Sequence, residues 1–214
     1  MADNKTQYGF RWASAWNGGK SCPVPIKMTV ASGQDDQDDG SNSVDINIGD
    51  PLKALAAGGV GLAVTTDPID FICVGILPHW DAGQGVMRPN SKLPNQTTWG
   101  TVEARRSYVM CVPATAGLWE IDCDDSSTAT TFAAYVALIH SNCNHVVAGN
   151  TANTSAKPEI DISSTAATET LELRIMGISE TAENKDFSGA QVKLIVAVNE
   201  TNLPGSAATN VVGL

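Results

Sequence analysis

The chain has 214 residues, of which 43% are hydrophobic and 17% charged, and its formal net charge is -10. This balance is typical of a globular protein and excludes a largely disordered one. An acidic surface repels phosphate backbones, so we expect no direct nucleic-acid partner. The sequence contains no apolar run near the roughly 20 residues that a membrane-spanning helix needs, so we expect no membrane partner.

The N-terminal sequence is polar and lacks the apolar region of a secretion signal. We therefore expect the protein to be made and folded in a cytoplasm, where thiols stay reduced. The cysteines are odd in number, scattered, and without a CxxC pair, which predicts free thiols and no disulfide. They are Cys22, Cys73, Cys111, Cys123 and Cys143.

Strand patterns dominate the chain. In three segments apolar and polar residues alternate, which predicts antiparallel strands with one buried face. Two further segments are continuously apolar, which predicts strands that are buried on both faces. The alternating segments are Val44–Ile48, Leu171–Ile175 and Gln191–Val198, and the apolar segments are Phe71–Leu77 and Tyr108–Pro113.

Helical patterns are few. Asp50–Gly58 predicts one short helix, with Asp50 as the N-cap, Pro51 as the first helical residue and Gly58 as the stop. Farther along, Thr130–His140 fits a second helix or a strand equally well, because its β-branched and aromatic residues also suit a strand.

Two long polar segments separate the strand patterns. Gly83–Gly100 is rich in Gly, Pro and Asn, which indicates a long loop or a connection between domains. Ala148–Thr168 is a second polar excursion, and loops of this length are often functional. We predict an all-β fold, an antiparallel sandwich or barrel type with few short helices. It would comprise two small β domains, residues 1–100 with an N-terminal arm and residues 101–214.

Two motifs suggest ligand binding but are better explained as loops. Asn17–Ser21 resembles the end of a phosphate-binding loop, but Ser14 stands where that motif needs glycine, so we predict a turn. The acidic run Asp35–Asp39 lacks the spacing and the terminal Glu of a calcium loop. We predict that it is a solvated loop.

Clusters with catalytic residue types are equally weak. His140, Cys143 and His145 offer zinc ligands, but a structural zinc site needs four ligands in recognisable pairs. They could also form a Cys–His dyad, but nothing in the sequence activates the thiol. The acidic stretch 122–125 after Trp119 suits glycoside hydrolysis or a turn at the end of a strand. We predict no catalytic residue, no metal, no cofactor and no enzymatic activity.

Three parts of the chain resemble virion proteins of tailed bacteriophages. The first is a strand, a Gly-Asp turn and a later apolar-Gly-Ile-Leu strand, as in phage head decoration proteins. The second is a pair of strands in mid-chain, and the third resembles the closing strands of virion proteins encoded beside the major capsid gene. The segments are Ser43–Pro51 with Ile72–Leu77, Arg105–Pro113 with Leu118–Ile121, and Leu171–Ile178 with Glu183–Asp186 and Val192–Glu200.

The resemblance implies a capsid decoration protein, also called a cement protein. Such proteins lie on the outside of the expanded capsid, often as homotrimers at local threefold positions, and clamp neighbouring capsid subunits. The expected partners are the phage major capsid protein and further copies of this chain, and the expected location is the capsid exterior of the virion. The family carries no catalytic residues, so the resemblance implies none here.

Two segments are candidates for contact with the capsid, the N-terminal arm Met1–Trp16 and the loop Gly83–Gly100. The arm is rich in aromatic residues, which are the anchors that often dominate interface energetics. Equally, these aromatics fit a first core strand, and both interpretations stay open. They are Tyr8, Phe10, Trp12 and Trp16.

Other functions also fit the sequence. A tail, baseplate or head-fibre component of a virion predicts the same composition and differs in copy number. A carbohydrate-binding module or adhesin domain would use tryptophans, with Trp80 and Trp119 as the candidate sugar contacts. An enzyme such as a glycan depolymerase ranks last, because no persuasive catalytic constellation is present.

Overall fold

The fold was analysed in a computed structural model, which describes about two thirds of the chain and is mostly β. For residues 79–81, 86–88 and 92–93 only the backbone is described. Among the described residues, no helix combines the length and the apolar character needed to cross a membrane. The described ranges are 9–30, 46–56, 58–81, 86–88, 92–93, 108–124, 129–146, 157–168, 170–181, 184–188 and 191–203.

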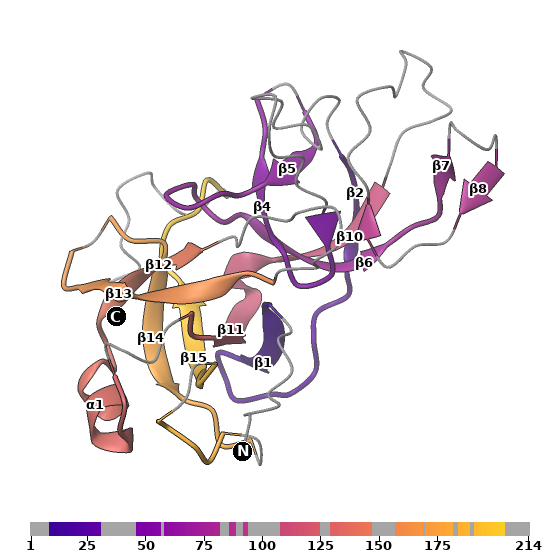
Figure 1. The fold of residues 1–214 in the computed structure, drawn as a ribbon. Helices are drawn as coiled ribbons and strands as arrows, with labels where there is room; N and C mark the ends of the chain where they lie inside the picture. Colours follow the sequence, from indigo (N-terminus) through magenta and orange to yellow (C-terminus); the bar gives the residue numbers. More distant parts are fainter. Residues whose placement is uncertain are drawn as a thin grey trace.

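Two antiparallel sheets form the body of the molecule (Figure 1), which confirms the predicted all-β fold. The six-stranded sheet has the order β1 (Arg11–Ala15), β11 (Gly117–Asp122), β15 (Lys193–Val198), β14 (Leu173–Ile178), β12 (Asn142–Val146) and β13 (Glu159–Ala166). The five-stranded sheet has the order β2 (Ile26–Thr29), β10 (Tyr108–Pro113), β6 (Phe71–Ile76), β4 (Pro51–Ala54) and β5 (Val60–Leu62).

The remaining described elements are short. Strand β3 (Ile46–Asn47) pairs with β9 (Lys92–Leu93), and β7 (His79–Asp81) pairs with β8 (Val86–Arg88). Strands β8 and β9 therefore lie within the segment 83–100, which was predicted to be a long loop or a connection between domains. A 3-10 turn, η2 (Ala114–Ala116), connects β10 to β11, and one α-helix, α1 (Phe132–Ala137), lies beside the six-stranded sheet (Figure 1).

The main core lies between the two sheets. In strand β15 the alternating sequence matches this core, because every second residue from Val192 to Val198 is buried in it. The five-stranded sheet contributes Ile72 and Val112 to the same core. Its opposite face covers a second core that includes Phe71, Cys73, Val109 and Cys111. Strands β6 and β10 are thus buried on both faces, which confirms the prediction from their continuous apolar sequences.

The predicted helix at 50–58 is wrong, because this segment forms the β4–β5 hairpin. Leu52 lies opposite Phe71 of β6 and is fully buried in the second core. Asp50 accepts a hydrogen bond from the Asn47 amide at 2.6 Å, so it stabilises the turn before β4 instead of capping a helix. The burial of Leu52 outweighs the local helical preference, which is worth only a few tenths of a kcal/mol per residue.

Three further segments have structures that the sequence left open or did not predict. Of the two readings of 130–140, the helix is observed, and the Thr131 hydroxyl caps it by accepting from the Ala134 amide at 3.2 Å. The polar excursion 148–168 contains strand β13, whose Ile160 and Ile162 are buried in the main core. Ile48 does not share a face with the buried Ile46, because the chain turns after Asn47 and leaves Ile48 exposed.

The strands cross the predicted domain boundary near residue 100. Strand β1 from the N-terminal part pairs with β11, and β10 from the C-terminal part pairs with β2 and β6. Each of the two large sheets therefore contains strands from both sides of the boundary. The boundary itself lies outside the described residues.

Candidate functional site

The connection between β1 and β2 carries an exposed apolar surface. Trp16 is 49% exposed, Val24 87% and Ile26 46%. These three residues are half of the six large hydrophobic side chains that are exposed among the described residues. We call Trp16, Val24 and Ile26 the N-terminal apolar surface. Exposed apolar groups gathered in one short segment are typical of an interaction site.

Strand β1 fixes the start of this surface. It is the outermost strand of the six-stranded sheet and pairs with β11 (Figure 1). The Trp12 ring packs edge-on against Trp119, with 5.3 Å between the ring centroids, and its indole Nε1 donates to the Lys20 carbonyl at 3.1 Å. Arg11 forms an ion pair with Glu120 of β11. These contacts hold the chain that leads to Trp16.

A glycine allows β1 to approach β11 closely. A Cβ atom at Gly117 would lie 2.3 Å from the Ser14 carbonyl oxygen and 2.6 Å from Trp12 Cη2. Both distances are far below van der Waals contact, so only glycine fits at this position. The position of β1, and with it the direction of the following turn, therefore depends on the missing side chain at residue 117.

The chain reverses after β1 and then runs to β2. The Gly18 amide donates to the Ala15 carbonyl at 2.9 Å, and Gly18 has a φ of 80°, which glycine adopts without strain. This turn overlaps the one that the sequence predicts for 17–21. The Trp16 indole donates to the Thr115 carbonyl at 3.0 Å, while Ile26 lies opposite Cys111. Both ends of the apolar surface therefore lie along the segment 111–115.

The structure separates the aromatic residues that the sequence groups together as capsid contacts. Tyr8 lies outside the described residues. Phe10 is only 4% exposed and belongs to the main core, and Trp12 is partly buried against the same core. These two residues have the environment of a first core strand, which was the alternative interpretation. Trp16 is the member of the described arm that offers substantial apolar surface to a partner.

Val24 and Ile26 are the site residues that the sequence analysis missed. Val24 stands between Pro23 and Pro25, and proline cannot donate the amide hydrogen that an inner strand needs. A valine between two prolines is therefore poorly placed for an inner strand, which forms hydrogen bonds with a neighbouring strand on each side. This pattern was the available signal that an apolar residue would stay at the surface.

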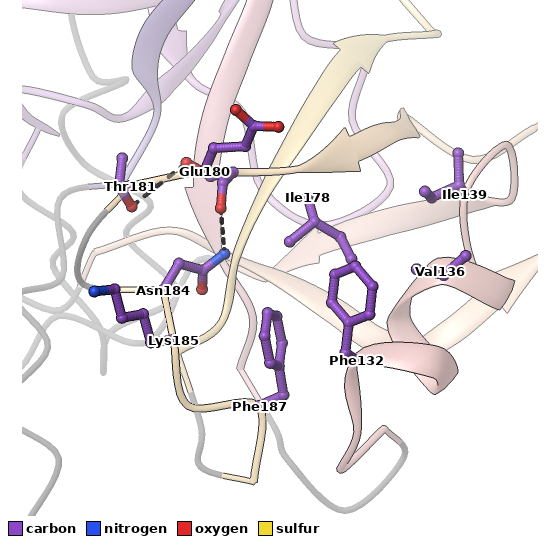
Figure 2. Close-up of a pocket in the computed structure, with 10 residues that line it drawn as sticks. Phe132, Val136, Ile139, Ile178, Glu180, Thr181, Asn184, Lys185 and Phe187 are labelled. Carbon is purple, nitrogen blue, oxygen red and sulfur yellow. Dashed lines mark hydrogen bonds between the residues drawn. The ribbon is translucent and has the colours of Figure 1, made fainter.

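A second apolar feature is a groove of about 420 Å³ beside α1. Figure 2 shows Phe132 of α1 facing Phe187, with Ile178 next to them, while Asn184 and Lys185 line the other part of the groove. Phe132 is 56% exposed, and its ring centroid lies 5.2 Å from that of Phe187. We call this feature the α1 groove. It combines an apolar part with a polar part, so it suits an amphipathic ligand.

The α1 groove is held in shape by Asn184. Its side-chain amide donates to the Ser179 carbonyl at 2.8 Å and to the Lys193 carbonyl at 2.9 Å, and its Oδ1 accepts from the Lys193 amide at 2.9 Å. Asn184 therefore joins the loop that carries Lys185 and Phe187 to strand β15. Because all these hydrogen bonds are internal, Asn184 acts as a structural support for the groove.

The histidine and cysteine cluster does not converge on a metal. His140 is exposed at the surface, whereas Cys143 and His145 are buried. Within the described ranges, no group of three or more potential ligands could hold a metal ion. Burial, followed by the nearby charge of Glu172, raises the pKa of the Cys143 thiol, so this thiol is not poised as a nucleophile.

The described carboxylates of the acidic stretch 122–125 do not form the exposed pair that glycoside hydrolysis would need. Asp122 is buried and lies 3.1 Å from the Lys193 ammonium, which is buried as well. Asp124 accepts a hydrogen bond from the Ile162 amide at 3.2 Å. Both carboxylates thus support the sheet. Asp125 and the run 35–39 lie outside the described residues.

All five cysteines are free thiols in the structure, but their environments differ. Cys22 is exposed on the β1–β2 connection, and the other four are buried. Burial raises the pKa of Cys111 to about 12, and burial together with the adjacent Cys111 thiol also raises the pKa of Cys73. A thiol with such a pKa is almost fully protonated near pH 8 and reacts slowly.

We therefore expect one fast-reacting thiol in the native protein. Titration with a disulfide reagent at pH 8 should label Cys22 rapidly, and denaturation should release the remaining four thiols. A Cys22→Ser variant should lose the fast phase and keep the four slow thiols. Two or more fast thiols in the native protein, or fewer than five after denaturation without reductant, would contradict the described environments.

The N-terminal apolar surface consists of one aromatic and two aliphatic side chains that are exposed. Trp16 supplies an aromatic anchor, a residue type enriched among the dominant contacts of interfaces. Val24 and Ile26 add exposed aliphatic side chains farther along the same connection. Comparisons with protein-family models, with curated proteins and with solved structures find no match to this chain.

Proposed function

We propose that this chain is a structural virion protein that binds the outside of an expanded phage capsid and clamps neighbouring major capsid subunits. The resemblance of three sequence segments to phage virion proteins suggests the partner. The observation that carries the proposal in the molecule is the N-terminal apolar surface, with Val24 at 87% exposure. Such a side chain gains free energy when a partner covers it, about 25 cal/mol per Å² of apolar surface.

The physical role of the clamp is mass action. A protein that binds the expanded shell and not its precursor stabilises the expanded state by an amount that grows with its concentration. We propose that the protein acts as a homotrimer, because a local threefold position offers three equivalent contacts at once. Three linked weak contacts bind far more firmly than one. The net charge of -10 keeps the free protein soluble and away from nucleic acid.

A charge placed in the N-terminal apolar surface should weaken this binding. We expect Val24→Asp to weaken binding to expanded shells that lack the native copy by about 30-fold, because losing one central apolar contact costs about 2 kcal/mol. Val24 is almost fully exposed, so the variant should fold normally. Co-sedimentation with the shells measures the affinity, and circular dichroism checks the fold.

Val136→Asp is the matched control. Val136 is also exposed, but it lies on α1 and not on the N-terminal apolar surface. We expect this variant to bind the shells like the parent protein. If Val24→Asp binds as well as the control, the surface assignment is wrong. If the parent protein binds no shell, the decoration function itself must be abandoned.

Carbohydrate binding is a second candidate, and the α1 groove is the observation that favours it. Trp119 is fully buried, so it cannot contact a sugar, which corrects one of the two predicted contacts. The Trp80 side chain lies outside the described residues. Phe132 instead presents a partly exposed ring in the apolar part of the groove, and Asn184 and Lys185 line its polar part (Figure 2). Glycan-array binding that Phe132→Ser removes and Val24→Asp leaves intact would favour this function over capsid binding.

A further inference from the structure

His145 is a buried histidine that joins the two sheets. It lies on β12 of the six-stranded sheet and is fully buried. Its ring Nδ1 lies 3.1 Å from Glu172 Oε2. Glu172 directly precedes β14 of the same sheet. Its ring Nε2 lies 3.0 Å from the carbonyl oxygen of Ala63, which follows β5 of the five-stranded sheet. The imidazole therefore spans the space between the sheets.

The chemistry of the two partners sets the number of ring protons. A backbone carbonyl can only accept a hydrogen bond, so Nε2 must donate to Ala63. Glu172 Oε2 already accepts from the His145 backbone amide at 2.9 Å, as expected of a carboxylate oxygen. An ionised carboxylate also only accepts, so Nδ1 must donate when Glu172 is ionised, whereas a protonated Glu172 would itself donate to Nδ1. A neutral imidazole carries one ring proton and cannot donate to both partners, so an ionised Glu172 requires a cationic ring.

We infer that His145 is a doubly protonated imidazolium in the folded protein, and that its ion pair with Glu172 and its bond to Ala63 form a pH-sensitive lock between the sheets. Both side chains of the pair are fully buried. A buried ion pair is costly to break from one side, because the remaining charge is left without a partner. The lock therefore opens when the ring loses a proton.

The surrounding charged groups are mostly acidic. Burial is the largest cause that raises the pKa of Cys143, and the charge of Glu172 raises it further. The pKa of Glu200 is also raised, first by burial and then by Glu172. Next to Ala63, Asp70 is buried and accepts hydrogen bonds from the Thr201 hydroxyl and the Asn202 amide. The nearby residues Asp67 and Lys53 form an ion pair, and Asp161 lies on the adjacent β13.

This environment gives the pH dependence a clear direction. Two described bases lie near the lock: Lys53, which is paired with Asp67, and Arg174 on β14, which lies opposite Asn142 of β12. The lock contributes to stability while the ring is charged and Glu172 is ionised. Its contribution is lost as the pH rises far enough to remove the ring proton in the folded state.

Nitrogen NMR of the ¹⁵N-histidine-labelled protein tests the protonation directly. The chain has three histidines, His79, His140 and His145, and correlations from each ring to its own backbone amide assign the signals in the parent protein. At pH 7 we expect both ring nitrogens of His145 to carry protons, and these protons to exchange slowly with water. An unprotonated Nδ1 or Nε2 at pH 7 would overturn the inference. This readout uses the unmodified fold, so it stands even if a variant fails to fold.

Equilibrium unfolding across pH provides the second readout. The parent protein should be more stable than His145→Gln at pH 7, and this advantage should shrink as the pH is raised toward 10. His140→Asn is the control, because His140 is exposed and has a φ of 75°, which asparagine tolerates. Its difference from the parent should not follow the same pH course. An advantage over His145→Gln that stays constant with pH would refute the lock.

Discussion

Replacing Trp119 with alanine is expected to lower the free energy of unfolding by about 3–5 kcal/mol, the usual cost of removing a large aromatic side chain from a core. Trp119 is fully buried on β11, between the partner strands β1 and β15. It packs edge-on against Trp12, and its indole donates to the Ala114 carbonyl at 2.7 Å. The substitution removes core volume, an aromatic pair and a buried hydrogen bond together.

Urea unfolding followed by circular dichroism measures this loss. Trp119→Phe serves as a graded control, since it keeps most of the aromatic packing and removes the hydrogen bond to Ala114. Its loss should be clearly smaller than that of the alanine variant. Equal losses for the two variants would show that packing against Trp12 contributes little. A loss below about 1 kcal/mol for Trp119→Ala, the range of a surface substitution, would contradict the described core.

A single added methyl group at Gly117 should also have a large effect. The new Cβ would meet the Ser14 carbonyl at 2.3 Å and the Trp12 ring at 2.6 Å, so β1 must move away from β11. Forcing extra atoms into a packed site typically costs about 1–3 kcal/mol. Because β1 leads directly to Trp16, Gly117→Ala should also weaken shell binding, although no residue of the N-terminal apolar surface has changed.

Gly177→Ala is the matched control for this prediction. Gly177 lies on β14 of the same sheet, and a Cβ atom there would have no neighbour within 4 Å. We expect this variant to unfold and bind like the parent protein. Tryptophan fluorescence should report increased solvent exposure of Trp12 in Gly117→Ala alone. If both glycine variants are equally stable, the close approach of β1 to β11 is not required for the fold.

Strand patterns in the sequence predicted the central sheet well. In β15 the alternation from Val192 to Val198 places one face in the core, because successive side chains of a strand point to opposite sides. The segment 50–58 shows the limit of such local reasoning. Its N-cap, proline and glycine signals all favour a helix, but the burial of Leu52 against β6 decides the structure, and that contact cannot be read locally.

The candidate sites depend even more on contacts between distant segments. The aromatic pattern of the N-terminal arm included Trp16 but could not separate it from Phe10, because the burial of Phe10 depends on distant segments that form the main core. The lock at His145 joins residues that are 27 and 82 positions away in the sequence. Its histidine was noticed in the sequence, but its partners are assembled by the two sheets alone.

Electron cryomicroscopy of the phage particle that contains this chain tests the proposed function most directly. The proposal predicts many copies on the outside of the expanded shell, three around each local threefold position that is occupied. The N-terminal apolar surface, Trp16, Val24 and Ile26, should lie against the major capsid protein. Density for this chain in a tail, baseplate or fibre, or on the shell with these three residues facing solvent, would contradict the proposal.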